Sequence, residues 1–356
     1  ADAGLAKKTP LATATLLVGV NLPDVDAFTY FVTSADTALY LRRGWTHGVL
    51  AMVVLPTVLA GLVALFERAW RQRRDPQAEP IHFAWILGLA YLGFLTHPFL
   101  DWLNTYGIRL LMPFDGRWFY GDTLFIVDPW LWLTLGGAAF LYHSQTWRSR
   151  IAWGALGLAA AALLLSNTAG QPLARLLWFA GLAGVLFLRW RTTRPTSAWL
   201  ARGALVCMAL YIGVLHAGSA QAHRDVEARL PDLGITASDV MIGPVPVRPL
   251  RHVVVIDTAR EYRFGTYDWL AEPRLEILAQ TLPKPSEEPA VQAAFGAHCL
   301  RGMANWTRYP WVEIEEDENG TIVHVMDARY TRSRTAGFGG SSVRIGRDLR
   351  PDCAEE

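Results

Sequence analysis

Histidine and aspartate, two residue types that bind metals, occur at short spacing within apolar parts of this sequence. The segment LTHPFLDWLNTYG (95–107) carries His97 and Asp101 four residues apart in an aromatic-rich run. Side chains at i and i+4 share one helix face, and imidazole and carboxylate together bind zinc or another divalent first-row metal. The upstream segments NLPDVDAF and RRGWTHGV supply further groups of the same types. The candidate metal ligands are Asp24 or Asp26, His47, His97 and Asp101.

Pro98 follows His97 directly and affects the geometry expected there. Proline inside a helix frees the carbonyl four residues earlier, here that of Phe94, and disfavours helical geometry at the residue before it. We therefore expect a kink at this point that tilts His97 toward a cavity.

The composition indicates which solvent surrounds these segments. Of the 356 residues, 52% are hydrophobic and 18% are charged, against about 25% charged in soluble proteins. Lys and Arg number 33 against 32 acids, so net charge gives no reason to expect a nucleic-acid partner. Long runs with few ionisable groups end near residue 217. The sequence predicts a mainly α, polytopic membrane domain over 1–218 and a soluble α+β domain over 219–356.

A membrane-spanning helix needs roughly 20 mostly apolar residues. Six segments are candidates, although one of them, 128–143, is short. A further apolar stretch, 10–23, is too short to span and is expected to pack inside the bundle. The six expected spans are 47–66, 82–103, 128–143, 151–166, 173–188 and 198–218.

Basic loops stay on the cytoplasmic side of a membrane. With six spans, the basic segments 67–74, 147–150 and 189–194 all fall on one side. The candidate ligands and the tail from residue 219 then fall on the other side, which we expect to be extracytoplasmic. No cleavable signal peptide is visible, and the opening ADAGLAKK indicates a trimmed N-terminus.

Further charged residues near the same face extend the candidate site. Asp122 and Asp128, in the region after the second span, are candidates for a general base or for orienting a metal ligand. Arg42 and Arg43 precede His47 and are candidates for binding a phosphate, or form an interfacial pair of cations. Ionisable groups in membrane segments usually mark function, yet each of these residues alone also fits a role as a cap, turn or interfacial group.

The motifs LPDVDAF, RGWTHG and THPFLDWLNTYGIRLLMPF, followed by FIVDP, resemble the bacterial YdjM-like family of membrane-bound metal-dependent hydrolases. The resemblance is strong over roughly the first 145 residues. It implies an inner-membrane location and a distant likeness to zinc-dependent phospholipases C and single-strand zinc nucleases. Family members usually open with a short histidine-containing motif, which lies upstream of this sequence. The resemblance places metal ligands at Asp24 or Asp26, His47, His97 and Asp101.

The tail is expected to be a small α+β domain. Residues 220–234 suit a helix that ends near Pro231 and Gly234, and 252–269 suit two strands around a short turn. Residues 311–331 predict a hairpin around Asn319-Gly320. The stretch 273–306 is expected to be a helical or irregular excursion between the strands.

The three cysteines bear on the compartment. Cys207 lies within the last expected span, whereas Cys299 and Cys353 lie in the tail. Oxidising compartments favour disulfides. We therefore expect a bond between Cys299 and Cys353, with two unpaired thiols as the alternative.

These features together predict a hydrolase that uses a divalent metal, with zinc expected, at the extracytoplasmic face. The expected substrate is a phosphoester or a lipid-linked compound, and the expected partner is the membrane lipid. One alternative is a transporter or channel with the acids and histidines as an ion path; a path should cross the bilayer, whereas the candidates lie at one face. A second alternative is a non-catalytic scaffold whose outer domain binds partners.

Overall fold

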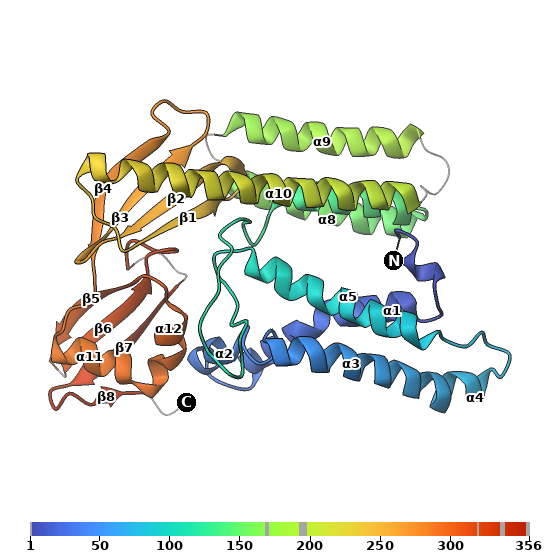
Figure 1. The fold of residues 1–356 in the computed structure, drawn as a ribbon, viewed down its shortest axis with the longest axis horizontal. Helices are drawn as coiled ribbons and strands as arrows, with labels where there is room; N and C mark the ends of the chain where they lie inside the picture. The colour runs from blue at the N-terminus through green and yellow to red at the C-terminus, as the bar shows by residue number, and fades with distance from the viewer. Residues whose placement is uncertain (1, 168–170, 192–197, 319, 335–338, 354–356) are drawn as a thin grey trace.

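The computed structural model describes residues 2–167, 171–191, 198–318, 320–334 and 339–353. The N-terminal part is helical, and most of the tail is built from two four-stranded antiparallel sheets. Figure 1 shows the long helices lying roughly along one direction, with both sheets at one end of them. This is the helical bundle followed by an α+β domain that the sequence predicts.

Five helices in the described part of the chain are long and apolar enough to cross a membrane. The first is α3, which continues without a break through a π-helical turn into α4. The five are α3 (Val49–Phe66) with its extension (Glu67–Arg71) and α4 (Gln72–Arg74), α5 (Phe83–Trp102), α8 (Trp147–Asn167), α9 (Pro172–Arg191) and α10 (Ala198–Arg229).

The sixth expected span, 128–143, is a shorter and segmented helix. A π-helical turn at Trp132–Gly136 joins α6 (Pro129–Leu131) to α7 (Gly137–His143). At 1.5 Å per residue this helix is about 22 Å long, less than the ~30 Å hydrocarbon core. It nevertheless links the two ends of the bundle. At one end, Trp130 Nε1 donates to the Val247 carbonyl in the tail (3.2 Å). At the other end, the carbonyl of Ser144, just past His143, accepts from Arg150 of the basic segment 147–150.

The basic segments gather at the end of the bundle away from the sheets. Arg150 and Arg189 both donate to the carbonyl of Ser144, at 3.1 Å and 2.9 Å, and Arg202 donates to the carbonyl of Ala3 at 2.9 Å. Figure 1 shows α4 at this same end. The helices therefore alternate in direction as the predicted topology requires, and the tail lies opposite the basic segments.

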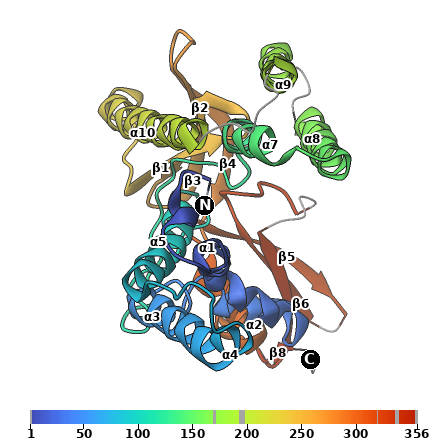
Figure 2. The same cartoon turned by 90° about the vertical axis from the view of Figure 1, so that its right-hand side faces the viewer.

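The short apolar stretch near the N-terminus forms α1 (Ala12–Asn21), which packs against α5 as expected. Two glycines permit the close approach. A β-carbon on Gly93 would lie 3.0 Å from the Leu16 carbonyl oxygen, and one on Gly19 would lie 3.3 Å from that of Ala90. Figure 2, seen along the helices, shows α1, α3 and α5 as one group and α7 to α10 as another.

The last membrane helix continues directly into the tail. α10 runs through residue 218, where the boundary between the two domains was expected, and its final turns bury Ala222 and Val226 against the first sheet. The helix ends at Arg229, shortly before Pro231 and a left-handed Gly234 (φ 66°). The helix predicted over 220–234 is therefore the end of a longer helix.

The two sheets follow chain order and are connected by two short helices, α11 (Pro289–Gly296) and α12 (Arg301–Trp306). The hairpins predicted at 252–269 and 311–331 are present, although Asn319 of the predicted turn lies outside the described residues. The strands are β1 (Asp239–Val245), β2 (Arg248–Asp257), β3 (Glu261–Asp268) and β4 (Leu275–Pro283), then β5 (Pro310–Asp317), β6 (Gly320–Asp327), β7 (Gly340–Gly346) and β8 (Pro351–Asp352).

The prediction for 273–306 was wrong in its first part, because β4 is a strand. Its register against β3 shifts between Arg263 and Gly265. A bulge of this kind breaks the two-residue alternation by which a strand is recognised. The buried residues Leu275 and Leu282 therefore have no alternating pattern between them.

Cys299 and Cys353 form a disulfide, with their Cα atoms 5.7 Å apart. The bond ties the segment before α12 to the segment after β8 and closes a long loop of the tail. Cys207, on α10, is an exposed free thiol.

Candidate metal centre

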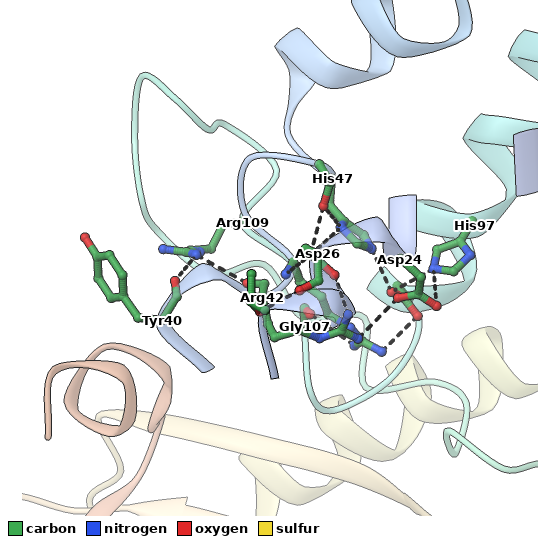
Figure 3. A network of polar contacts seen from close by, with 12 residues as sticks. Asp24, Asp26, Tyr40, Arg42, His47, His97, Gly107 and Arg109 are labelled. Carbon is green, nitrogen blue, oxygen red and sulfur yellow. Dashed lines mark hydrogen bonds and ion pairs between the residues drawn. The ribbon is translucent and has the colours of Figure 1, made fainter. Parts of the chain in front are cut away.

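Four of the predicted ligand residues converge at the end of the bundle that faces the sheets. Asp24 lies in η2, a 3-10 segment (Leu22–Phe31), His47 lies in the turn before α3, and His97 and Asp101 lie near the end of α5. One ligand atom from each lies within 4.8 Å of the others. We call these four residues the ligand cluster. Figure 3 shows Asp24, His47 and His97 toward one end of a network of polar contacts.

Asp101 lies between the two histidines. Its Oδ2 is 3.2 Å from His47 Nε2 and 3.4 Å from His97 Nε2. The Asp24 carboxylate approaches from the other side, 3.5 Å from His97 Nε2. His47 is fully buried, whereas the Asp24 side chain is 45% exposed, so Asp24 marks the open side of the cluster.

His97 presents its Nε2 atom to the cluster. Its Nδ1 lies 2.8 Å from the backbone carbonyl of Val20, which only accepts hydrogen bonds, so Nδ1 carries the proton. Its Nε2 is buried and has no hydrogen-bond partner among the described residues. α5 continues as a helix through His97 and Pro98, and α1 packs closely against it.

His47 is oriented in the same way by a side-chain relay. The Thr46 hydroxyl donates to Asp26 Oδ2 at 2.8 Å, and its oxygen then accepts from His47 Nδ1 at 2.9 Å. The Nε2 atom of His47 therefore faces Asp101, 3.2 Å from its Oδ2. Metal-binding histidines usually carry such a hydrogen bond on the ring nitrogen away from the metal.

Asp26 stands behind the ligand cluster, and Asp24 is the acid within it. Asp26 accepts the backbone N–H of Arg43 at 2.8 Å, the Thr46 hydroxyl and the Arg42 guanidinium. Between the two acids that the sequence left open, the structure gives Asp24 the ligand position and Asp26 a role in orienting its neighbours.

The two arginines before His47 both reach the carboxylates of this network. Arg42 bridges Asp26 and Asp24, the latter at 3.2 Å, and Arg43 Nη2 donates to Asp101 Oδ1 at 2.9 Å. The positive charge of Arg42 at this distance favours the ionised form of Asp24. Asp24 is therefore ionised at neutral pH, as a metal ligand must be.

Two glycines allow the histidine turn to fit against the loop that follows α5. A β-carbon on Gly44 would lie 2.4 Å from the Arg109 guanidinium, and one on Gly48 would lie 2.3 Å from the Met112 carbonyl oxygen. The backbones also pair: Arg109 N–H donates to the Arg43 carbonyl at 2.9 Å. The position of His47 thus depends on the 104–112 segment.

The tail supports this loop through a stack of aromatic and cationic groups. The Arg43 guanidinium lies 4.4 Å above the Tyr106 ring, which packs 4.9 Å from Trp306 of α12, and Trp306 stacks on Tyr330 at 5.3 Å. Burial raises the pKa of the Tyr106 hydroxyl. Arg329 donates to the Thr105 carbonyl at 2.6 Å. The tail therefore helps to hold Arg43 against Asp101.

The two other acids predicted near the site have different partners. Asp122 forms an ion pair with Arg308 of the tail at 2.7 Å. Asp128 caps α6 by accepting the backbone N–H groups of Trp130 and Leu131, and it also accepts the Tyr211 hydroxyl at 3.0 Å. Neither belongs to the ligand cluster.

Sequence reasoning missed three residues that shape the site. Thr46 relays between Asp26 and His47; Asn104 accepts from Arg43 Nη1 at 3.2 Å and from the Tyr106 backbone at 2.8 Å. The third is Tyr106 itself. All three lie within or beside the quoted motifs, but a threonine, an asparagine and a tyrosine carry no metal-ligand signal that would have singled them out.

Comparison with known proteins agrees with the resemblance seen in the motifs. Residues 2–173 match the family of the YdjM inner membrane protein. An uncharacterised protein of Bacillus subtilis, YfhP, is 26% identical over 145 residues, which are 40% of this chain and 39% of that protein. The match thus spans well under half of that relative's length. No solved structure matches.

Proposed function

We propose that this membrane protein, whose residues 2–173 match the YdjM inner membrane protein family, is a metal-dependent hydrolase of phosphoesters. The observation that carries the proposal is the ligand cluster: two imidazoles and two carboxylates meet within 4.8 Å. Such groups repel one another unless a cation or protons lie between them. Two nitrogen and two carboxylate donors suit zinc, which is the metal we expect.

A divalent metal at such a site supplies Lewis-acid activation of water and of the phosphoryl group. The chain's own residues supply orientation and charge. Val20 and Thr46 fix the ring positions of His97 and His47, as their hydrogen bonds show. Arg42 lies beside the exposed Asp24, which places it closest to an incoming phosphate, whereas Arg43 is held against Asp101 and orients that ligand.

The group that meets an incoming water is assigned within the ligand cluster. Asp122 and Asp128 were candidates for a general base, but Arg308, Tyr211 and backbone groups engage them. Asp24 is the most exposed acid of the cluster, so it is the acid placed to orient that water.

We place the site and the tail at the extracytoplasmic face. The basic segments lie at the opposite end of the bundle, and basic loops stay in the cytoplasm. The tail disulfide fits an oxidising compartment. Alkaline phosphatase fused after residue 356 should be active in intact cells; an inactive fusion at normal expression would reverse the orientation.

Metal analysis tests the proposal most directly. The purified full chain should hold a tightly bound divalent metal and should hydrolyse bis(p-nitrophenyl) phosphate. His97→Ala should lose both properties while still inserting in the membrane, because the apolar spans are unchanged. His82→Ala is the matched control, since His82 is exposed at the other end of α5.

Three measurements on variants of the ligand cluster separate the hydrolase from the alternative functions. Equal effects of His97→Ala and His82→Ala on metal content would count against the hydrolase. A transporter would show flux of an ion that depends on the cluster without phosphoester cleavage. A scaffold would keep its cellular phenotype after loss of both His97 and Asp101.

A further inference from the structure

An apolar groove leads to the open side of the ligand cluster. It is an open, shallow groove between α1 and η2, with a volume of about 410 Å³. Its walls include Leu17, Val18, Val25 and Phe28, which are 46–67% exposed. Asp24 also lines it and is its single charged residue.

The groove and the cluster therefore share one side chain. Asp24 is the most exposed member of the cluster, with 45% of its side chain accessible, against 17% for His97 and 16% for Asp101. Access to the cluster from the groove side is through Asp24. Arg42, 3.2 Å from Asp24, adds a positive charge at the same polar end.

The groove's walls lie on the bundle, beside helices that cross the membrane. α1 packs against α5, and η2 carries the chain to the end of the bundle, where Phe31 and Val32 are 83% and 79% exposed. An exposed apolar surface beside membrane-spanning helices is suited to contact with lipid chains. A ligand that fills the groove and reaches Asp24 must be apolar along most of its length and polar at one end.

We propose that the groove holds an acyl chain of a membrane phospholipid and presents its phosphate ester to the ligand cluster. The inference rests on the proposed hydrolase function and names its substrate class. The acyl chain would occupy the space beside Val18 and Val25, while the phosphate would lie at the Asp24 end of the groove, where the divalent metal that the cluster would hold would supply the complementary charge. Hydrolysis would add water across the phosphate ester, giving a phosphate monoester and an alcohol.

Filling the groove tests this substrate without touching the cluster. Val18→Trp should lower hydrolysis of phosphatidylglycerol in vesicles by about tenfold or more, the range by which a pocket discriminates on size. The same variant should hydrolyse the small soluble bis(p-nitrophenyl) phosphate at the wild-type rate. Val58→Trp is the matched control, because Val58 on α3 is also a valine and is equally exposed, at 49%; it should change neither rate.

A binding measurement gives a readout that does not depend on turnover. Phosphatidylglycerol with a photoreactive acyl chain should label residues 17–28 more strongly than the exposed face of α3, and Val18→Trp should remove the excess. Equal labelling of the two regions, or equal vesicle rates for Val18→Trp and Val58→Trp, would overturn the groove assignment. Cleavage of the soluble ester without cleavage of vesicle lipid would overturn the substrate class and leave the hydrolase intact. A chain without metal and without either activity would defeat the hydrolase itself.

Discussion

The ligand cluster in the membrane half and the ion pair of Asp327 with Arg329 in the tail are both groups of buried charge, but they are satisfied differently. Asp327 is fully buried and accepts from Arg329, from the Thr307 hydroxyl and from the Arg308 backbone. Arg329 also donates to the carbonyls of Thr105 and Trp306. In the ligand cluster, by contrast, buried His97 Nε2 has no hydrogen-bond partner among the described residues and faces two carboxylates.

The difference indicates what each group is for. The fold supplies every hydrogen bond seen on the Asp327 carboxylate, so this pair needs nothing from outside. In the ligand cluster two imidazoles and two carboxylates converge, and the buried Nε2 of His97 has no hydrogen-bond partner among the described residues, which is costly. A cation bound between these groups would remove that cost. We therefore read the Asp327–Arg329 pair as structural and the ligand cluster as a binding site.

The largest expected change in stability comes from breaking the Asp327–Arg329 ion pair, here called the tail pair. Asp327→Ala should lower the free energy of unfolding of the tail by about 3–5 kcal/mol, because it leaves the Arg329 guanidinium buried without its partner. Hydrogen exchange of strands β6 and β7 in the detergent-solubilised protein measures the change. Glu315→Ala, which removes an exposed ion pair with Arg334, should stay within about 0.5 kcal/mol. A small effect of Asp327→Ala would mean that the tail pair is not structural.

The tail disulfide should have the next effect. Cys299 and Cys353 are separated by 54 residues, and closing a loop of that length stabilises by roughly 4 kcal/mol in the chain-entropy account. Cys353→Ser should lower the stability of the tail by up to that amount in the same exchange experiment. Cys207→Ser is the control and should be neutral. Wild-type protein purified without reductant that has three free thiols would contradict both the bond and the outward placement of the tail.

The sequence predicted the parts of the molecule that depend on local patterns. The apolar runs located the long helices, and the alternating residues around 252–269 and 311–331 located two hairpins. The expected topology placed His47, His97 and Asp101 at the same face of the membrane. Together with their residue types, this was enough to predict that they meet in one cluster.

Features that depend on contacts distant in the sequence were not predictable in this way. β4 was missed because a bulge breaks its alternation, and the partners of Asp122 and Asp128 come from the tail and from α10. The choice between Asp24 and Asp26 depends on how Thr46 and Arg43 N–H hold Asp26, about twenty residues away. Nothing in the local sequence distinguishes the two acids.

A histidine in the tail sharpens the comparison through its pH dependence. His252 is 3% exposed, and its Nδ1, like His97 Nε2, has no hydrogen-bond partner among the described residues. Burial lowers the pKa of His252 to about 4, with Asp268 opposing. The folded tail therefore keeps His252 neutral, while the unfolded chain protonates it near pH 6.5. The contribution of neutral, buried His252 to the free energy of unfolding of the tail is fully present above pH 6.5. This free energy falls by roughly 3 kcal/mol in total as the pH drops from 6.5 toward 4.

His252→Phe should flatten this part of the stability profile, measured as melting temperature between pH 7.5 and 4. His298→Gln, at an exposed position, should leave the profile unchanged. Added zinc should not protect His252, because a lone buried imidazole lacks the carboxylates that surround His97. An unaltered acid profile in His252→Phe would show that burial does not keep this histidine neutral.

The smallest effect concerns the relay behind the ligand cluster. Thr46→Val keeps the size and shape of the side chain but removes the hydroxyl that joins Asp26 to His47 Nδ1. Loss of such an orienting hydrogen bond typically weakens metal binding 10–100-fold, which corresponds to about 1.4–2.8 kcal/mol. Competition of the full chain against a zinc-binding dye measures the change. Thr46→Ser should restore most of the affinity, and Thr57→Val, which removes an exposed hydroxyl on α3, should have none of this effect. If Thr46→Val bound zinc as tightly as the wild type, His47 would not owe its orientation to Asp26, and packing alone would hold its ring in place.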